Sequence, residues 1–378
     1  ADGGMTWSNR NHYLPGGLIV GISQSGDGNL VAGFQDNGSK KSTGTLAWLD
    51  MASAGGDGGW AKIDAGNSQK MYHTYIVSGN VASDLIRRTT NGGTGATDIT
   101  PAVAVGAEGS EFYPYVAMDP EDSTKLYLGL HHLYGTTDSG TSWTRIGAVD
   151  SPAGASFNIS CAHGAPDTAG TVYVGATDNK IYRTVSANLG NSAAWTDVSA
   201  NGLPTNSVPT AIAIHPTNSS TVYVTYSNFG TVAAPRLHVY KTSDAGVSWI
   251  GVSTGLPDVP VNDIVLDTGA PNNLFIATDV GVFNSIDSGV TWTRSDIGIP
   301  EGMVVQSLSL NSGTRKLAAG TYGRGAYTLT IPSPAPVPTG LGGAAHGISS
   351  VTLSWSASGA KYNVQAYGVY YTTNPTVL

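Results

Sequence analysis

Apolar and polar residues alternate in short runs along most of the chain. Clear examples are Lys125–Gly129 (KLYLG), Thr171–Gly175 (TVYVG), Thr221–Thr225 (TVYVT) and Asn273–Ala277 (NLFIA), which are rich in β-branched and aromatic residues. A period of two predicts half-buried β-strands. We find no stretch with the 3.6-residue period of an amphipathic helix. The pattern therefore predicts an all-β fold.

The predicted strands recur in sets. An alternating segment that ends in a turn precedes each strand named above, as in Tyr115–Pro120, Ala211–Pro216 and Asp263–Asp267. A third strand follows, such as Gly281–Asn284, and a fourth begins at Trp292. Repeats of about 40–50 residues with four strands each are typical of the blades of a β-propeller.

A recurring turn separates the third strand from the fourth. It reads Ser/Thr, any, Asp, any, Gly, any, Ser/Thr, Trp, and it occurs at Thr136–Trp143, Thr242–Trp249 and Ser285–Trp292. Ala1–Trp7 carries the same pattern without its first residue. Short side-chain oxygens bond nearby backbone amides and Gly accepts positive φ, so these residues favour a tight turn. The Trp adds a large apolar anchor.

Weaker copies of the turn fill the gaps between these strong ones. We assign them to Asp57–Trp60, to Thr89–Thr94 without its Trp, and to Thr184–Trp195 with an insertion. Together with the four strong copies they predict seven blades.

The last set of strands lacks its turn and its fourth strand. Val304–Leu310, Lys316–Thr321 and Ala326–Ile331 are three strands, whereas a turn and a strand without partners stand at Ala1–Arg10. An unclosed ring exposes strand edges, so we expect Trp7–Arg10 to be the outer strand of the last blade. The expected blades are residues 15–66, 70–101, 111–150, 155–200, 207–256, 260–299, and 302–331 together with 1–12.

The eight-residue turn resembles the Asp box, or BNR repeat, of sialidases, sortilin-type receptors and family 74 glycoside hydrolases. The resemblance implies a seven-bladed Asp-box β-propeller over residues 1–331. In those proteins the boxes are structural turns away from the binding face. The resemblance therefore implies that Asp138, Asp244 and Asp287 are scaffold residues.

A different composition follows the last predicted strand. Residues 332–338 (PSPAPVP) predict a stiff proline-rich linker. Beyond it, Thr339–Leu341, Val351–Trp355 and Tyr362–Val364 resemble the first strands of a fibronectin type III domain. Residues 339–378 are too few for the about 100 residues of such a sandwich, so the resemblance implies a partial domain.

Composition narrows the class of protein. The chain has 378 residues, 50 Gly, only 12% charged residues and a net charge of −8, which argues against nucleic acid or an anionic membrane as partner. No apolar run approaches the ~18 residues of a membrane span. Cys161 is the single cysteine, so neither an intrachain disulfide nor a cysteine metal cluster is expected. Few Lys residues and abundant Thr, Asn and Gly favour a secreted protein. Because the chain begins inside a repeat turn, we expect its N-terminus to be a processed or cut end.

Candidate site residues lie in the turns that follow the second strand of each blade. Equivalent turns in a ring converge on one mouth of its central channel, and converging polar groups are what a binding site requires. The candidate catalytic carboxylates are Asp36, Asp178 and Asp279, and the candidate binding residues in these turns are Gln35, Asn37, His131, Asn228 and Arg324. An Asp before Gly or Asn is also an ordinary turn residue, so a purely structural role stays open for each.

Aromatic residues add a second set of candidates for the mouth. Tyr72, His73, Tyr75, Phe112, Tyr113 and Tyr115 precede or begin predicted inner strands of the second and third blades. Tyr faces stack on sugar rings, and we assign Tyr72, His73 and Tyr113 to substrate binding. Packing between blades is the alternative for Tyr75 and Tyr115.

Asp36 carries the closest match to the family 74 enzymes. In them a catalytic Asp follows the second strand of an early blade, and an aromatic third strand comes next. Here Phe34–Gly38 precedes Leu46–Leu49 and Trp60, after a long connection through Lys40 and Lys41. Glycosidases need a second carboxylate roughly 5–10 Å away, and Asp178, Asp279 and Glu111 are the candidates. The family places its cleft between two propellers, whereas this chain holds one.

Other chemistries have little support in the sequence. Sialidases bind the substrate carboxylate with three arginines, the first of them in an Arg-Ile-Pro motif. This motif is absent here, and Arg145 and Arg294 lie on predicted outer strands, away from the expected site. His73, His131 and His163 have no metal-ligand spacing. We predict no cofactor, because the sequence has no phosphate loop, nucleophile elbow or dinucleotide fingerprint.

Two functions remain open. The first is a secreted, glycoside hydrolase-like protein that acts on or binds polysaccharide or glycoconjugate at the channel mouth. The second is a non-catalytic extracellular binding, adhesion or matrix protein that contacts other proteins. A carboxylate pair with one raised pKa at the mouth favours the first, and a mouth lined by Tyr and Asn alone favours the second.

Overall fold

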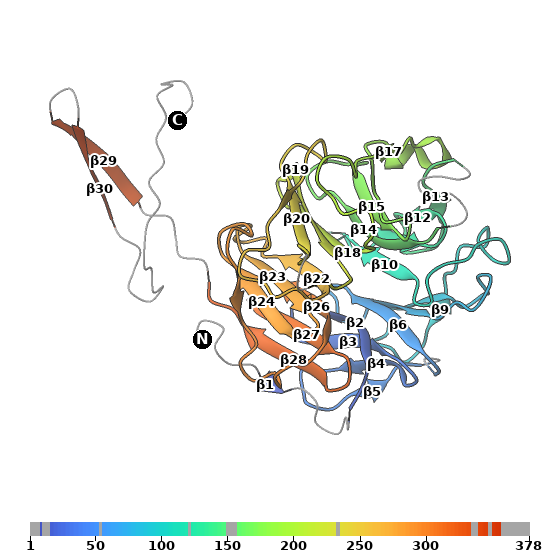
Figure 1. The fold of residues 1–378 in the computed structure, drawn as a ribbon. Coiled ribbons are helices and arrows are strands. Elements are labelled where there is room, and N and C mark those ends of the chain that lie inside the picture. Colours follow the sequence, from blue (N-terminus) through green and yellow to red (C-terminus); the bar gives the residue numbers. More distant parts are fainter. Residues whose placement is uncertain are drawn as a thin grey trace.

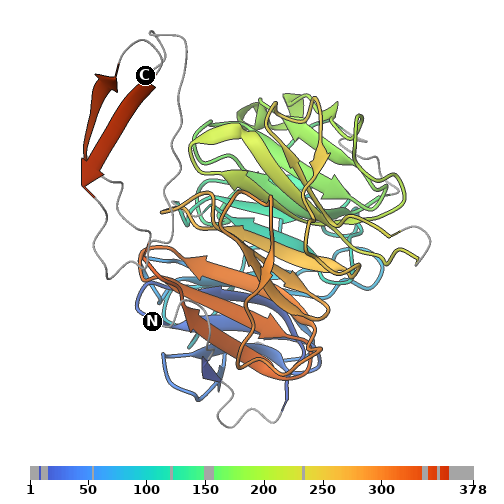
Figure 2. The same ribbon diagram turned by 60° about the vertical axis from the view of Figure 1, so that its left-hand side comes forward.

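A computed structural model describes residues 8–9, 16–52, 55–119, 122–148, 157–231, 235–333, 339–346 and 350–356. Seven four-stranded antiparallel sheets follow one another as the blades of a ring (Figures 1 and 2). Among the described residues, the helical content is one 3-10 segment, η1 (Ala187–Ser192). The prediction of an all-β, seven-bladed propeller is confirmed.

Six blades run in chain order from an inner strand to an outer one, and the seventh takes its outer strand, β1, from the start of the chain. The first four sheets are β2 (Ile19–Gln24), β3 (Leu30–Phe34), β4 (Gly38–Ser42) and β5 (Leu49–Asp50); β6 (Gly58–Ile63), β7 (Met71–Tyr75), β8 (Ile86–Thr89) and β9 (Thr97–Asp98); β10 (Tyr115–Met118), β11 (Leu126–Gly129), β12 (Leu133–Thr136) and β13 (Thr144–Arg145); and β14 (Ile159–Gly164), β15 (Val172–Ala176), β16 (Ile181–Thr184) and β17 (Thr196–Asp197). The last three are β18 (Pro209–His215), β19 (Asn218–Tyr226), β20 (Val239–Thr242) and β21 (Ile250–Gly251); β22 (Val261–Leu266), β23 (Leu274–Thr278), β24 (Gly281–Ser285) and β25 (Thr293–Arg294); and β26 (Val305–Asn311), β27 (Lys316–Thr321) and β28 (Gly325–Thr330) with β1 (Ser8–Asn9).

The N-terminal strand closes the ring. β1 pairs with β28 in antiparallel register, Ser8 with Thr328 and Asn9 with Tyr327, and it forms the outer edge of the last sheet (Figure 1). This closure covers an edge of β28 that would otherwise be open. The predicted turn at residues 1–7, including Trp7, lies outside the described residues.

The border between the first two blades differs from the prediction. Gly58–Ile63 is the inner strand of the second blade, so the turn assigned to Asp57–Trp60 is wrong. Its two glycines allow β6 to lie against β3, because a Cβ on Gly58 would stand 2.9 Å from the backbone nitrogen of Phe34 at the end of β3. The turn of the first blade runs instead from Ser42 to Trp48, one residue shorter than the others, and its Trp48 ring meets Phe34 edge-on at 5.5 Å.

Bulges in the inner strands bind the blades to one another. A register shift occurs near the start of the inner strand in six sheets, at Ile19/Gly21, Gly58/Ala61, Ile159/Cys161, Pro209/Ala211, Val261/Asp263 and Val305/Ser307. A bulge re-aims the extra side chain. Ser160 Oγ thus donates to the Pro209 carbonyl at 2.7 Å and Thr210 Oγ1 to the Val261 carbonyl at 2.5 Å. Each bond joins one inner strand to the next.

The strong repeat turns (Thr136–Trp143, Thr242–Trp249 and Ser285–Trp292) share one set of hydrogen bonds. In the first, Asp138 Oδ1 accepts from Thr136 Oγ1 at 2.8 Å and from the Ser142 amide at 2.9 Å, and Oδ2 accepts from Ser142 Oγ at 2.6 Å. The Ser142 hydroxyl is the main reason why the pKa of Asp138 falls to about 2. The carboxylate is used within its own turn, as expected for a scaffold residue.

Tryptophan indoles tie the third, fourth, fifth and sixth blades each to the one before it. Trp143 Nε1 donates to the Ile99 carbonyl at 2.6 Å, Trp249 Nε1 to that of Val198 at 2.8 Å and Trp292 Nε1 to that of Val252 at 2.7 Å. Trp195 Nε1 makes the equivalent bond to Ile146 at 2.9 Å, so the copy with an insertion occupies the expected place.

The degenerate copy at Thr89–Thr94 folds in the same way. Asn91 Oδ1 accepts from Thr89 Oγ1 at 2.8 Å and from the Gly95 amide at 2.9 Å. An amide oxygen therefore replaces one carboxylate oxygen of the strong copies, and Ala96 stands at the Trp position.

This natural substitution predicts how Asp287 responds to mutation. We expect Asp287→Ala to lower the free energy of unfolding by about 1–2 kcal/mol, because the Thr291 amide and hydroxyl lose their acceptor. Asp287→Asn retains one acceptor oxygen, as Asn91 does, and should cost less than half as much. Urea denaturation of the two variants measures the difference, and equal losses would contradict a hydrogen-bonding role for Oδ1.

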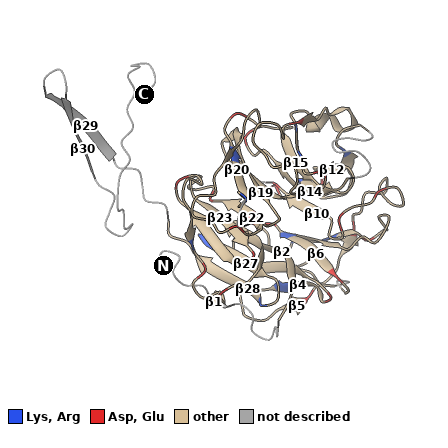
Figure 3. Ribbon diagram, viewed as in Figure 1, with Lys and Arg blue, Asp and Glu red and all other residues tan. Residues whose placement is uncertain are grey.

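Two strands lie beyond the propeller sheets. β29 (Thr339–His346) and β30 (Ser350–Ser356) form an antiparallel hairpin. Residues 334–338 and 357–378 lie outside the described residues, so the linker and the fibronectin resemblance stay predictions. In the part of the chain that the structure describes, no helix has the length and apolar character to cross a membrane. Charged residues are sparse and scattered over the blades (Figure 3).

Candidate functional site

The turns after the second strands all lie on one face of the ring. We call it the Asp36 face, defined by residues 35–37 and the equivalent turns at 130–132, 177–180, 279–280 and 322–324. The repeat turns follow the third strands, and because neighbouring strands are antiparallel they lie on the opposite face. We call that one the repeat-turn face.

The turn at Asp36 is tight. It joins β3 directly to β4, and Asp36 has a φ of 61°, a left-handed conformation that Asp tolerates better than most residues. The Gln35 amide donates to the Leu18 carbonyl at 2.9 Å, and Asn37 Nδ2 donates to the Gln35 carbonyl at 3.1 Å. The long connection predicted through Lys40 and Lys41 is wrong, since both lie on β4. The Asp36 side chain is exposed on a fixed backbone.

A second carboxylate stands beside Asp36. Asp57 Oδ1 accepts the Asp36 amide at 2.7 Å, and the Gly38 amide donates to the Gly56 carbonyl at 2.6 Å. The loop before β6 therefore leans over the Asp36 turn. The sequence reasoning missed Asp57 because it placed this residue in a repeat turn; the adjacent Gly58 and Gly59, which let β6 approach β3, are the signal that identifies it.

Two tyrosines complete this group. Tyr322, 43% exposed, lies in the turn after β27, and its hydroxyl donates to Gln35 Oε1 at 2.6 Å. Tyr113 precedes β10 and is half-buried. Burial, and then the negative charges of Asp57 and Asp36 beside it, raise the pKa of Tyr113 to about 12. We name Gln35, Asp36, Asp57, Tyr113 and Tyr322 the mouth cluster; its members come from the seventh and first blades and from the segments that precede the second and third blades.

A buried network holds the loop that carries Tyr113. His132 Nδ1 lies 2.6 Å from Glu108 Oε1, and the Tyr134 hydroxyl donates to the same oxygen at 3.0 Å. Burial raises the pKa of Glu108, but the bonds to His132 and Tyr134 outweigh it and the net pKa is lowered. The charged carboxylate therefore anchors residues 100–114 to β12. His131 lies beside this network, where the Gly109 amide donates to its Nδ1 at 3.3 Å.

Aromatic and acidic neighbours flank Tyr113 on the same loop. Phe112, 49% exposed, meets the Tyr113 ring edge-on with centroids 4.9 Å apart. Glu111, a candidate partner carboxylate, accepts a hydrogen bond from Asn158 Nδ2 at 2.9 Å. Phe112 thus extends the aromatic surface of the mouth cluster.

The other predicted turn residues lie on the Asp36 face and are bonded within or next to their own turns. Asp178 accepts from the Lys180 amide at 3.1 Å and from the Tyr182 hydroxyl, and Asp279 accepts from Asn262 Nδ2 at 2.9 Å. Asn228 Nδ2 donates to the Asn206 carbonyl at 2.9 Å, and Arg324 is exposed. Their assignment to catalysis or binding stays a prediction.

Tyr72 and His73 are placed differently from the prediction. They lie on β7, the second strand of the blade, and both are 0% exposed, so the expectation that they begin an inner strand and face the mouth is wrong. The Tyr72 hydroxyl donates to the Ser123 carbonyl at 2.8 Å. The His73 ring packs on Tyr75, and its two nitrogens are buried without a hydrogen-bond partner. Burial, with a contribution from Arg87, lowers the pKa of His73 to about 4.

The residues weighed for other chemistries lie apart from the mouth cluster. Arg145 and Arg294 are on the outer strands β13 and β25, as expected, and Arg294 pairs with Asp296 at 2.7 Å. His163 Nδ1 lies 2.7 Å from the Gly164 carbonyl oxygen. Within the described ranges, no three His, Cys, Asp or Glu side chains are grouped as metal ligands would be.

Comparison with known proteins identifies the fold and nothing finer. No protein-family model matches the chain, and a search of curated proteins finds no relative. Among solved structures, YCF48 from Cyanidioschyzon merolae is 15% identical with a TM-score of 0.58, covering 86% of this chain and 98% of that one. YCF48 bound to a D1 peptide is 12% identical with a TM-score of 0.56, covering 83% and 92%. The GH74 xyloglucanase from Xanthomonas campestris is 14% identical with a TM-score of 0.51, covering 84% of this chain and 59% of the enzyme.

Proposed function

We propose that this protein binds polysaccharide or glycoconjugate at the mouth cluster and cleaves it there in the manner of a glycoside hydrolase. The observation that supports this proposal is the meeting of two carboxylates and two tyrosines from separate segments of the chain. Tyrosine rings present apolar faces to sugar rings, and carboxylate and amide oxygens accept hydrogen bonds from sugar hydroxyls. The fold shared with a xyloglucanase is consistent with this chemistry.

The two carboxylates have different surroundings, as a glycosidase requires. Asp57 accepts the Asp36 amide and fixes the turn, whereas the Asp36 side chain is exposed and faces the substrate in this proposal. Burial and the neighbouring carboxylates raise the pKa of Tyr113 to about 12, so its buried hydroxyl is neutral at neutral pH and adds no charge to the cluster. We assign Asp36 to direct attack or proton transfer and Asp57 to the partner role.

A second candidate function is non-catalytic binding of a peptide or protein at the same face, in an extracellular binding or matrix role. The exposed rings of Phe112 and Tyr322 favour it, since aromatic residues are enriched in protein interfaces. A propeller of this fold has been solved with a bound peptide. Composition favours an extracellular location for either function.

A glycan array combined with a reducing-sugar assay tests the proposal. We expect wild-type protein to bind a polysaccharide on the array and to release reducing ends from it. Asp36→Asn and Asp57→Asn each remove one carboxylate with little change in shape, so release should fall by about 10²–10⁴-fold. Asp50→Asn, on the exposed outer strand β5, is the matched control and should retain full activity.

The outcomes separate the two functions. Glycan binding without release, weakened by Tyr322→Ala, would support a binding protein and exclude a hydrolase. Release that survives in both carboxylate variants would show that the mouth cluster is not the active site. A peptide array that captures the protein when the glycan array does not would favour the second function.

A further inference from the structure

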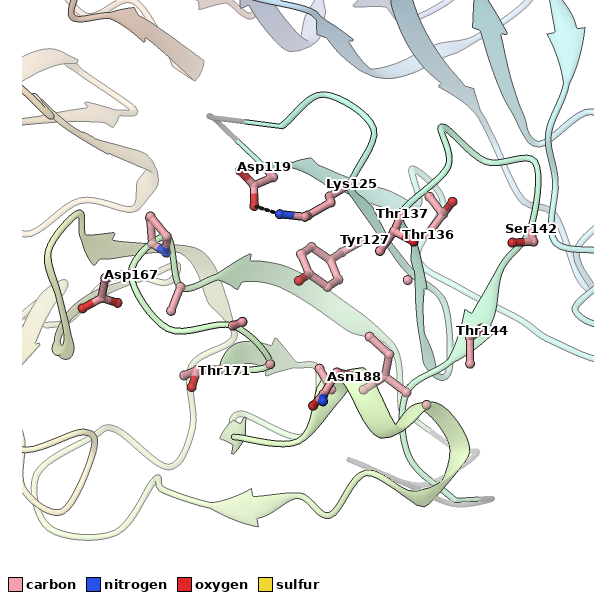
Figure 4. A pocket seen from close by; sticks show the side chains of 18 residues that line it. Asp119, Lys125, Tyr127, Thr136, Thr137, Ser142, Thr144, Asp167, Thr171 and Asn188 are labelled. Carbon is pink, nitrogen blue, oxygen red and sulfur yellow. Dashed lines mark ion pairs between the residues drawn. The ribbon is translucent and has the colours of Figure 1, made fainter.

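A cavity of about 540 Å³ opens between the third and fourth blades, on the repeat-turn face. Its walls include Thr136, Thr137 and Ser142 of one repeat turn, and residues 165–167 and 169–171 between β14 and β15 (Figure 4). The volume falls in the range of roughly 300–1,000 Å³ that small-molecule sites occupy. The cavity lies on the opposite face from the mouth cluster, so it is a separate site.

One glycine explains why the cavity is there. On β11, Tyr127 is paired across the sheet with Gly135 on β12. Three other blades have a tyrosine at the equivalent place, and a long basic side chain stands opposite each. These pairs are Tyr72 with Arg88, Tyr173 with Arg183, and Tyr223 with Lys241.

In two of these pairs the basic side chain covers the tyrosine ring. The Arg183 guanidinium lies 5.8 Å from the Tyr173 ring centre, and the Lys241 ammonium lies 5.5 Å from that of Tyr223. Both rings are at most 1% exposed, and the Tyr173 hydroxyl donates to the Ser219 carbonyl of the next blade at 3.1 Å. Tyr127, by contrast, is only partly buried. Without a side chain at Gly135, part of its ring faces the cavity (Figure 4).

The Tyr127 ring is held in place from behind. A Cβ on Gly164 would lie 2.8 Å from the ring, so the missing side chain at Gly164 makes room for it. The ring also packs against the apolar core of the fourth blade. The side of the ring that packs on the protein is therefore fixed, and the remaining part lines the cavity. The ring can thus serve as an aromatic platform, that is, a rigid flat surface on which a ligand ring stacks.

Hydrogen-bond donors and acceptors surround the Tyr127 ring. Lys125 pairs with Asp119 at 3.9 Å at one edge, and Asp167, Thr171 and Asn188 line the other (Figure 4). The two carboxylates exceed the single ammonium by one negative charge, which disfavours an anionic ligand. Burial, and then Asp119, raise the pKa of Tyr127 to about 12, so its hydroxyl remains a donor at neutral pH.

We propose that this cavity is a second ligand site, which takes a neutral saccharide with one ring face stacked on Tyr127. A pyranose has an apolar face of C–H groups and a rim of hydroxyls that both donate and accept. The cavity offers the matching set: an aromatic platform, carboxylate and amide acceptors, and hydroxyl and ammonium donors. The site stands on its own geometry and does not require activity at the mouth cluster.

Gly135→Arg is the decisive variant, because it restores the arrangement of the fourth blade. Gly135 has no positive φ, and a Cβ there meets first the end of the flexible Ile146 side chain at 2.9 Å. The arginine should cover Tyr127 as Arg183 covers Tyr173, and the propeller should still fold. Isothermal titration calorimetry with cellotetraose, maltotetraose and a neutral glycan selected on an array measures binding in wild type, Gly135→Arg and Asn188→Ala.

We expect a neutral saccharide to bind wild type. Its Kd should rise at least about tenfold in Gly135→Arg and by a smaller factor in Asn188→Ala, and it should stay unchanged in Asp50→Asn, which lies outside both sites. Thermal unfolding of each variant verifies the fold. Unchanged affinity in both cavity variants would overturn the proposal, as would binding that disappears in Asp36→Asn alone. Failure of all neutral glycans, with binding of sulfated or sialylated ones, would overturn it as well.

Discussion

Replacing Arg315 by Met is expected to lower the free energy of unfolding by about 3–5 kcal/mol. Asp267, which follows β22, is 0% exposed, and Arg315 Nη1 donates to its two carboxylate oxygens at 2.7 and 2.6 Å. The variant leaves the Asp267 carboxylate buried without its counter-ion. The free-energy cost of removing this charge from water is then no longer offset by the guanidinium. The loss should be large because the pair also joins the sixth blade to the seventh.

The same guanidinium holds the end of the propeller. Its Nε and Nη2 donate to the Pro332 carbonyl at 3.2 and 2.5 Å, and the Ile331 amide donates to the Arg315 carbonyl at 2.8 Å. Methionine keeps the length and the apolar contacts of the stem. The measured loss therefore reports the charge and its hydrogen bonds and not a cavity.

Two further variants identify the cause. Lys180→Met breaks an exposed pair with Asp197 and should cost no more than about 1 kcal/mol. Adding Asp267→Leu to Arg315→Met removes the uncompensated charge and should recover part of the loss. If urea denaturation gave equal losses for Arg315→Met and Lys180→Met, the buried charge would not be the cause.

The fold could be predicted because its information is local. The strand alternation, the repeat turns and their Trp anchors each depend on residues a few positions apart. Ring closure also followed, because three strands without a turn at one end matched a turn and a strand at the other, and β1 pairs with β28 accordingly.

The first two blades could not be divided correctly from the sequence. Asp57–Trp60 resembles a repeat turn in composition, yet Gly58 and Gly59 are small because β6 lies against β3. A glycine that serves close packing and one that serves a turn look alike in a sequence. The same error placed Tyr72 and His73 on the wrong strand.

The mouth cluster was predictable only in part. Gln35, Asp36 and Tyr113 were identified by their position relative to strands, but Asp57 and Tyr322 reach them from other blades. Such contacts depend on how far each loop leans over its neighbour. The cavity at Tyr127 was missed because its signal is a difference between blades: glycine where Arg or Lys stands opposite the tyrosine elsewhere.

Acid should destabilise this protein through His73 well before its carboxylates titrate fully. The imidazole is 0% exposed and its pKa is about 4 in the folded protein, against about 6.5 when the chain is unfolded. Between these values the unfolded chain binds a proton that the folded one does not, so stability rises with pH. The stability is complete above pH 6.5 and is lost as pH falls toward 4, by about 3 kcal/mol at most.

His73→Leu isolates this contribution. Leucine has a similar volume and no nitrogen atoms to leave unpaired, so the variant should match or exceed wild-type stability at pH 7. On going from pH 7 to pH 4, its free energy of unfolding should fall by about 3 kcal/mol less than that of wild type. Urea denaturation at both pH values gives the four free energies that this comparison needs.

His215→Leu is the matched control for that experiment. His215 lies at the end of β18, is half-buried, and accepts the Thr217 amide on Nδ1 at 3.3 Å. Burial lowers the pKa of His215 too. Because part of this ring is in contact with solvent, however, the folded protein can hold its proton at a smaller cost than at the fully buried His73. We therefore expect His215→Leu to follow the pH dependence of wild type closely. If His73→Leu also followed it, the buried imidazole would not be the group through which acid weakens the propeller.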